Sequence, residues 1–270
     1  MFIIYKRNNM GSLKKYIIES LLDDEDEVFD GAKENIIKDF LKTNYAIPSS
    51  YTIKETKDGF IVDVKGYIGV TNKNITSLTN GLFEFGEVDK QFYCDGCNSL
   101  KSLEGGPKKV GGSFYCDHCG SLTSLKGAPK EVGGDFNCAY CSNLKSLEGA
   151  PKEVKNFDCR RCDSLKTLKG APKWIVGDFY CLNCKSLKTL EGSPKEVKNF
   201  DCRGCDSLVS LKGSPEKIKG HFWGDDCESL KTLEGGPKEV MGIFFATNCG
   251  KKFTEDDVKK YTKIKWEPSV

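Results

Sequence analysis

Pairs of cysteines separated by two residues recur along this chain of 270 residues, and thiols at that spacing can do several kinds of chemistry. The pairs are Cys94/Cys97, Cys116/Cys119, Cys138/Cys141, Cys159/Cys162, Cys181/Cys184 and Cys202/Cys205. A CxxC pair can supply half of a zinc site, a redox couple, or two thiols that fill a core. The stretch from Cys94 to Cys119, C-x2-C-x18-C-x2-C, has the spacing of a zinc ribbon.

The cysteine pairs are periodic, which is unusual for an isolated metal site. The first cysteines of successive pairs lie 22, 22, 21, 22 and 21 residues apart. The series continues as Gly224/Cys227 and Ala246/Cys249 and extends backwards as Gly69/Asn72, so that nine units cover residues 67–250. A fixed period of about 20 to 29 residues is typical of a solenoid, in which each unit stacks on the next.

Each unit reads V-x-x-(x)-F-x-C-x-x-C-x-x-L-x-x-L-x-G-x-P, and the longer units have one extra residue beside a glycine. The shorter units, such as VKNFDCRRCDSL, resemble the cysteine form of the leucine-rich repeat, LxxLxLxxCxxL, of the short, helix-poor type found in bacterial and tailed-phage proteins. The resemblance covers the repeats and says little about residues 1–60. It implies a parallel sheet with one short strand per unit and a binding role, with no particular ligand.

The residue types predict the same fold independently. The Phe and the first Cys of each unit lie two positions apart and therefore point to the same side of a strand. Together with the second Cys and the two Leu, they are expected to form the buried side of each coil. Gly and Pro at fixed places in segments such as LKGAPKEVGG exclude a regular helix there. We therefore expect a mainly β solenoid with an extended or turn-like, helix-poor convex wall.

A charged position strengthens this prediction. The residue before the periodic glycine alternates in sign along seven units: Glu104, Lys126, Glu148, Lys169, Glu191, Lys212 and Glu234. Stacked coils would place these side chains about 4.8 Å apart, each between two opposite charges. Each exposed pair contributes at most about 1 kcal/mol, so the larger effect is expected on the register of stacking. Duplication of a two-unit block explains the same pattern.

The two ends of the chain differ from the repeats and are predicted to cap them. Apolar spacing predicts helices in residues 12–44, on SLKKYIIESLL and ENIIKDFL, with the acidic DDEDE between them. YTIKETKDGFIVDVKG predicts a hairpin that turns at Asp58 and Gly59. Thr254 is a predicted N-cap of a short helix, EDDVKKY. The expected domains are an α+β cap in 1–66, the solenoid in 67–250 and a C-terminal cap in 251–270.

Three functions of the cysteines remain open, and a structural ladder is favoured. The pairs follow the period of the Leu and Phe core, and Gly69, Gly224 and Ala246 replace the first Cys without any ligand chemistry. Asn72 replaces the second Cys, and leucine-rich repeats have Asn at that place, where it bonds neighbouring backbone groups. Cys does this job more weakly through its S–H. Zinc at some coils and redox or disulfide chemistry are the alternatives, although stacked thiols lie farther apart than disulfide geometry requires.

The positions left over on the predicted concave strand face vary from unit to unit. These are the residues just before and after the first Cys, and the position that follows. They hold three of the four arginines of the chain, and Tyr, Trp and Arg dominate interface energies. The predicted partner-binding residues are Tyr93, Tyr115, Tyr140, Arg160, Arg161, Tyr180, Arg203, Trp223 and Phe245. The β propensity of aromatic residues is a simpler explanation for the aromatics, but it does not account for the arginines.

Composition narrows the class of function. The formal net charge of +2 gives no basic excess for nucleic acid, and there is no apolar run long enough to span a membrane. The N-terminus is a poor signal peptide, and either Met1 or Met10 is the natural start, so we expect a cytoplasmic protein. We find no catalytic triad, phosphate loop or paired carboxylates, and His118 in CDHC is interpreted as a solvated histidine. No cofactor is expected.

These observations favour a non-enzymatic scaffold of phage or bacterial origin that binds a protein through its variable concave face. The first alternative is a structural or assembly component, for example of a virion, that makes its contacts through an edge or the acidic N-terminal helices. The second alternative is a zinc-binding CxxC module.

Overall fold

The computed structural model of the protein describes residues 30–46 and 50–264. The chain divides into two compact units, Met1–Leu41 and Lys42–Val270. In the first unit, the predicted helix on ENIIKDFL lies within helix α2 (Asp30–Asn44), which ends inside the second unit. The helix predicted on SLKKYIIESLL lies outside the described residues.

The second unit begins with short strands that join the repeats. Strand β1 (Tyr45–Ala46) pairs antiparallel with β4 (Ile68–Val70). Strands β2 (Tyr51–Thr56) and β3 (Gly59–Val64) form the predicted hairpin, which closes with Thr56 opposite Gly59. Strand β3 then runs parallel to β5 (Glu84–Val88), so the hairpin continues directly into the stacked coils.

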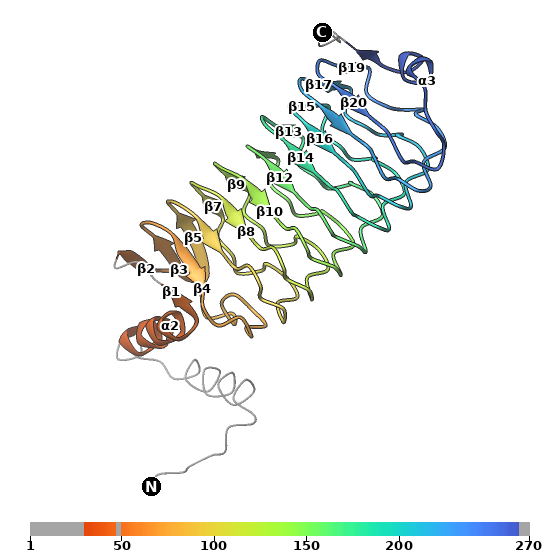
Figure 1. Cartoon of the computed structure of the whole chain (residues 1–270). Helices are drawn as coiled ribbons and strands as arrows, with labels where there is room; N and C mark the ends of the chain where they lie inside the picture. The colour runs from red at the N-terminus through yellow and green to blue at the C-terminus, as the bar shows by residue number, and fades with distance from the viewer. Residues whose placement is uncertain (1–29, 47–49, 265–270) are drawn as a thin grey trace. The chain divides into compact units, whose positions relative to one another are not determined.

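The repeats form a parallel β-solenoid, as predicted, with one strand of every coil in a single ten-stranded sheet (Figure 1). We call it the phenylalanine sheet, and its order is β1-β4-β6-β8-β10-β12-β14-β16-β18-β20. Its repeat strands are β6 (Phe92–Tyr93), β8 (Phe114–Tyr115), β10 (Phe136–Asn137), β12 (Phe157–Asp158), β14 (Phe179–Tyr180), β16 (Phe200–Asp201), β18 (Phe222–Trp223) and β20 (Phe244–Phe245). The extra residue of the longer units does not disturb this register, because Phe pairs with Phe throughout.

The wall predicted to be extended carries a second short strand in each coil. These wall strands are β7 (Lys109–Val110), β9 (Glu131–Val132), β11 (Glu153–Val154), β13 (Trp174–Ile175), β15 (Glu196–Val197), β17 (Lys217–Ile218), β19 (Glu239–Val240) and β21 (Lys263–Ile264). They belong to three sheets, β2-β3-β5-β7-β9, β11-β13 and β15-β17-β19-β21. In the wall strands from β7 to β19 the second residue is the buried one, and it supplies the wall's part of the core.

The core between the two rows of strands is built from the same kinds of position in successive coils. From Phe92 to Phe222 each periodic Phe is fully buried, and successive rings lie 5.2–6.0 Å apart between centroids. The two Leu and the wall Val or Ile are buried beside them. A fully buried Phe or Leu contributes about 1.5–3 kcal/mol to the stability of the fold. Because these side chains become fully buried only when the next coil stacks on them, the stability of each coil depends on its neighbours.

The alignment of the first coil needs a correction. Gly69 lies opposite Tyr93, so Val70, and not Gly69, takes the place of the first cysteine. The segment from the strand to the first Leu position is one residue shorter in the first coil, where it ends at Ile75, than in the next coil, where it ends at Leu100. Asn72 does correspond to Cys97, but its side chain is exposed and donates to Asn44 Oδ1 at 2.9 Å instead of bonding an earlier coil.

The charged column and the C-terminal helix agree with the sequence prediction where contacts are present. Glu191 contacts Lys169 of the coil before (3.4 Å) and Lys212 of the coil after (4.0 Å), and Lys126 contacts Glu104 at 2.8 Å. Helix α3 (Glu255–Lys259) begins with a capping box, in which the Thr254 side chain accepts from the Asp257 N–H. No helix in the described part of the chain is both long and apolar enough to span a bilayer.

Candidate functional site

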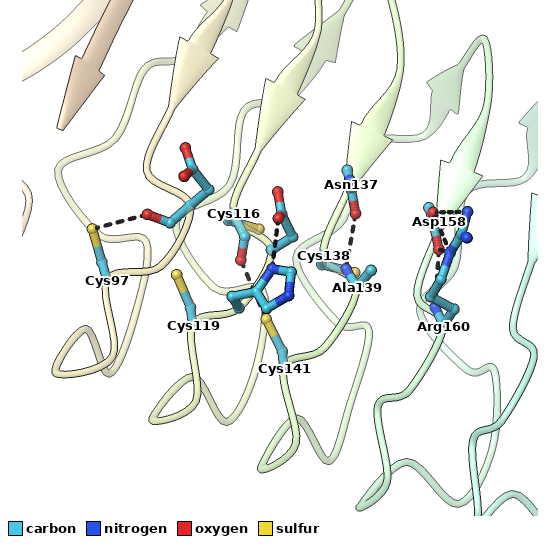
Figure 2. A network of polar contacts seen from close by, with 12 residues as sticks. Cys97, Cys116, Cys119, Asn137, Cys138, Ala139, Cys141, Asp158 and Arg160 are labelled. Atoms are coloured by element: carbon cyan, nitrogen blue, oxygen red, sulfur yellow. Dashed lines mark hydrogen bonds and ion pairs between the residues drawn. The ribbon is translucent and has the colours of Figure 1, made fainter. Parts of the chain in front are cut away.

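The cysteines form a regular ladder through the coils. From Cys119 onward, the thiol of each second cysteine donates to the main-chain carbonyl at the first-cysteine position one coil earlier, whereas the Cys97 thiol donates to Asp95 O of its own coil at 3.8 Å. The donor–acceptor pairs are Cys119–Cys94 (3.1 Å), Cys141–Cys116 (3.2 Å), Cys162–Cys138 (3.3 Å), Cys184–Cys159 (3.1 Å), Cys205–Cys181 (3.2 Å), Cys227–Cys202 (3.3 Å) and Cys249–Gly224 (3.3 Å). Figure 2 shows the sulfur atoms of Cys97, Cys119 and Cys141 at the same place in successive coils. The thiols therefore satisfy buried carbonyl groups, which is a structural task.

Burial favours the protonated form of the first cysteine of each pair. Burial raises the pKa of Cys94, Cys116 and Cys138 well above the ordinary value for a thiol. All the cysteines are free thiols, and only Cys249, in the last coil, is partly exposed. A nucleophilic or redox-active cysteine needs an accessible thiolate, and Cys94, Cys116 and Cys138 are buried with a raised pKa.

The described residues contain no group of three or more His, Cys, Asp or Glu side chains placed to hold a metal ion. From the Cys116/Cys119 pair onward, the two thiols of a CxxC pair differ in their contacts: the second bonds the coil before, and the first lies in the buried row beside the Phe rings. Four-thiolate coordination would require the thiols to converge and to ionise. The zinc-ribbon spacing of Cys94 to Cys119 recurs with the repeat period in the later pairs.

A second ladder of polar side chains lies on the outer side of the phenylalanine sheet, at the residues that precede Phe136 through Phe222. Asn156 Nδ2 donates to Asp135 Oδ1 (2.7 Å), and Asn199 Nδ2 donates to Asp178 Oδ1 (2.8 Å). The Asn side-chain oxygens accept main-chain N–H groups of the next coil, from Asp178 and His221, at 2.8 Å. The alternation of Asp and Asn in this column is visible in the sequence, but the sequence analysis did not predict a ladder there.

Two of the predicted arginines are held by a carboxylate of their own coil. Arg160 Nε lies 2.8 Å from Asp158 Oδ2, and Arg203 Nη2 lies 2.6 Å from Asp201 Oδ2. The carboxylates also accept the main-chain N–H of the same arginine, at 3.0 and 3.1 Å. Figure 2 shows the Asp158–Arg160 pair beside the cysteine ladder. The guanidinium groups are thus fixed in position and largely neutralised.

The same arginines also reach the next coil. The Arg160 guanidinium lies 5.3 Å from the ring centroid of Tyr180, and that of Arg203 lies 5.8 Å from Trp223. Tyr180 donates to Asp178 Oδ2 at 2.8 Å, and burial, followed by this hydrogen bond, raises its pKa to about 12. Each FDCR segment is therefore followed by an aromatic residue on which its arginine lies.

Three further predicted residues form contacts elsewhere on this side of the molecule. Tyr93 and Tyr115 stack, with 4.9 Å between ring centroids and planes 4° apart. Phe245, on the last repeat strand, pairs in register with Trp223 and is partly exposed.

Tyr140 and Arg161 lie in the turn after the strand, at the position before the second cysteine, where the chain adopts a positive φ in every cysteine coil. Tyr140 has φ 59° and Arg161 φ 54°, a conformation that few side chains other than Gly, Asn or Asp adopt. His118, in the same column, stacks on Tyr140 with 4.4 Å between centroids, and the Arg161 guanidinium lies 5.7 Å from the Tyr140 ring. His118 is exposed, as predicted, and lies 2.8 Å from the Asp117 carboxylate.

Not every residue that was expected to point outward is exposed. Asp201 and Ala139 are both only 2 % exposed, although they lie in the two outward columns. Asp201 is buried because Arg203 pairs with its carboxylate and the neighbouring coils flank it. The side of the strand was predicted correctly, whereas the covering of one outward side chain by another was not.

The nine predicted residues, which we call the candidate face, thus fall into a tyrosine pair, two arginine–aromatic pairs, the Tyr140–Arg161 pair and Phe245. Comparison with known proteins adds no relative: no family model, no curated protein and no solved structure matches the chain. What is established is a mainly β, parallel solenoid with a regular cysteine ladder.

Proposed function

We propose that the protein is a non-enzymatic scaffold that binds a protein partner through the candidate face. The observation that carries this proposal is the ordering of large aromatic and arginine side chains on one side of the solenoid. Four separate contacts between coils hold them: Tyr93–Tyr115, Tyr140–Arg161, Arg160–Tyr180 and Arg203–Trp223. Side chains that are already fixed lose little conformational freedom on binding, and Tyr, Trp and Arg are the residues that dominate interface energies.

The contrast between positions supports the proposal. The core and cysteine-ladder positions have nearly the same residue types from coil to coil, while the outward position before the first cysteine changes from Tyr to Asn, Asp and Trp. Tyr140 is 41 % exposed in a strained conformation that Gly96 and Gly204 adopt without a side chain in their own coils. A large exposed side chain at such a position contributes nothing to the core, which favours a role in binding.

The charges of the face favour a protein over a polyanion. Arg160 and Arg203 are paired with their own carboxylates, and Asp95, Asp117, Asp225 and Asp226 add negative charge on the same side. We further propose that the repeats are leucine-rich-repeat-like, since the thiol ladder performs the task of the Asn ladder of that family. The free thiols fit a reducing, cytoplasmic compartment of a bacterial or phage-infected cell.

A glycine exchange tests the proposal without straining the fold. Tyr140→Gly combined with Arg161→Gly gives these coils the residue already present at Gly96 and Gly204, so folding should be retained or improved. The control is Asn183→Gly with Asn248→Gly, which alters the same column outside the Tyr140–Arg161 pair. Partner capture from the native host, quantified by mass spectrometry, should fall at least about tenfold for the first variant and stay unchanged for the control. Equal capture by both variants would reject the candidate face.

A further inference from the structure

The wall opposite the candidate face carries one apolar site in an otherwise charged column. The first residue of each wall strand is charged, except on β13. From the N-terminal side these residues are Lys109, Glu131, Glu153, Trp174, Glu196, Lys217 and Glu239. Trp174 is 60 % exposed, and Val176, two residues later, is 73 % exposed.

The fold itself gives no reason for this pair. Ile175, between them, is buried and fills the core position that Val154 and Val197 fill in the adjacent coils. Charged residues flank the buried position in those coils, as Glu153 with Lys155 and as Glu196 with Lys198. An exposed Trp beside an exposed Val is the kind of apolar site that gains most from being covered by a partner.

The charges around the pair have a symmetry that selects the partner. In both flanking coils the acid precedes the buried residue and the base follows it. If two copies face each other across a two-fold axis parallel to the direction of stacking, the residue before the buried position meets the residue after it in the other copy. Trp174 then lies on Val176 of the second copy, Glu153 meets Lys155, and Glu196 meets Lys198. An axis along the strands would instead bring Glu153 against Glu196, which is a like-charge contact.

We propose that this wall is a self-association surface, on which a second copy of the chain packs wall to wall with its coils running in the same direction. Wall strands lie about 4.8 Å apart, so those from β7 to β19 provide a strip about 30 Å long. A standard interface buries about 800 Å² per partner, and most of this area would be charged or polar. Lys217 meets Lys219 of the second copy in this arrangement, so the dimer is expected to be weak, with a micromolar dissociation constant.

The oligomeric state of the full chain tests the proposal. Sedimentation velocity at about 100 µM should give a dimer for the natural sequence. Trp174→Lys combined with Val176→Lys should weaken the dimer at least tenfold, and both substitutions use a residue that other coils already have at that position, namely Lys109 and Lys155. Val209→Lys is the matched control, because Val209 is 52 % exposed between two leucines outside the wall strands. A natural sequence that is monomeric at this concentration, or a dimer unaffected by the double substitution, overturns the proposal.

A charge exchange tests the arrangement of the two copies. Lys155→Glu alone places a carboxylate against that of Glu153 in the second copy and should weaken the dimer severalfold. Glu153→Lys added to Lys155→Glu restores opposite charges across the two-fold axis and should restore the dimer. Glu196 is unsuitable for this test because it already pairs with Lys219 of its own chain at 2.5 Å. If the exchange fails to restore an association that Lys155→Glu has weakened, the parallel two-fold arrangement is wrong.

Discussion

Removal of Arg203 should destabilise the protein more than removal of Arg160, although the two arginines occupy the same place in an FDCR segment. The difference lies in the carboxylate. The Asp201 side chain is 3 % exposed and that of Asp158 is 16 % exposed. Arg203→Ala therefore leaves a charge that water cannot reach, whereas Arg160→Ala leaves one that can be partly rehydrated.

The expected magnitudes follow from the contacts that are lost. Arg203→Ala removes hydrogen bonds from Nε (3.0 Å) and Nη2 (2.6 Å) and the contact with Trp223, but the main-chain N–H of residue 203 still donates to Asp201. Charge-assisted hydrogen bonds contribute about 1.5–3 kcal/mol each when buried, and the half-exposed guanidinium reduces this through solvent screening. We expect losses of about 2 kcal/mol for Arg203→Ala and about 1 kcal/mol for Arg160→Ala.

Another coil of the same chain shows how the instability caused by the unpaired Asp201 carboxylate can be removed. In the third cysteine coil Asn137 and Ala139 stand where Asp201 and Arg203 stand, and Asn137 Oδ1 accepts the Ala139 N–H at 2.9 Å. Asp201→Asn combined with Arg203→Ala recreates that arrangement and removes the buried charge. The double variant should therefore lose only about 0.5 kcal/mol relative to the natural sequence, less than Arg203→Ala alone.

Urea denaturation followed by circular dichroism measures the global effect, and amide hydrogen exchange of residues 200–205 measures the local one, since repeat arrays can open coil by coil. A double variant as unstable as Arg203→Ala, or equal losses for the two arginines, would refute the reasoning that the buried carboxylate is the source of the instability.

Three further predictions concern the cysteines. Native protein at pH 8 should react with a thiol reagent at Cys249 alone, because this thiol is partly exposed whereas the other thirteen are buried. The reaction should be slow, since burial raises the pKa of Cys249 to about 11. Rapid reaction of more than one thiol would contradict the ladder. Burial raises the pKa of first cysteines such as Cys94, Cys116 and Cys138. The stability that their neutral thiols confer is therefore complete below the unfolded value of about 8.5 and is lost as the pH rises, so the urea midpoint should fall between about pH 8 and pH 10.5. A midpoint that rises with pH would contradict this sign. Gly224→Cys restores the missing member of the first-cysteine row and should stabilise the folded protein by about 1 kcal/mol. The Phe222 ring must turn aside to make room, because its Cε1 lies 2.7 Å from the added Cβ. A lower urea midpoint for the variant would contradict this prediction.

The periodic part of the fold could be predicted because the same residue types recur at each core position in coil after coil. Phe92, Cys94, Cys97, Leu100 and Leu103 recur with their spacing intact, and the alternation of strand side chains assigns them to one side. The thiol ladder also followed from the sequence, since the period of the cysteines matched that of the leucines.

What could not be predicted depends on neighbours in space. The burial of Asp201 comes from Arg203 and the adjoining coils, and alternation within one strand carries no information on that covering. The first coil was misaligned because its strand places Val70, an ordinary core residue, where later coils have cysteine. The exposure of Trp174 was not predicted, because the wall was expected only to be extended, with no sides assigned to its residues.

Site-specific photo-crosslinking in the native host tests the central claim most directly. A photoreactive phenylalanine analogue placed at Tyr115, Tyr140 or Phe245 samples the candidate face, and the same analogue at Lys188 or Lys231, exposed residues between the two leucines of their coils, samples another side of the same molecule. The account predicts that the positions on the candidate face yield one common crosslinked partner and that the two control positions yield none. A partner crosslinked from the control positions alone, or no discrete partner from any of the three face positions, would contradict it.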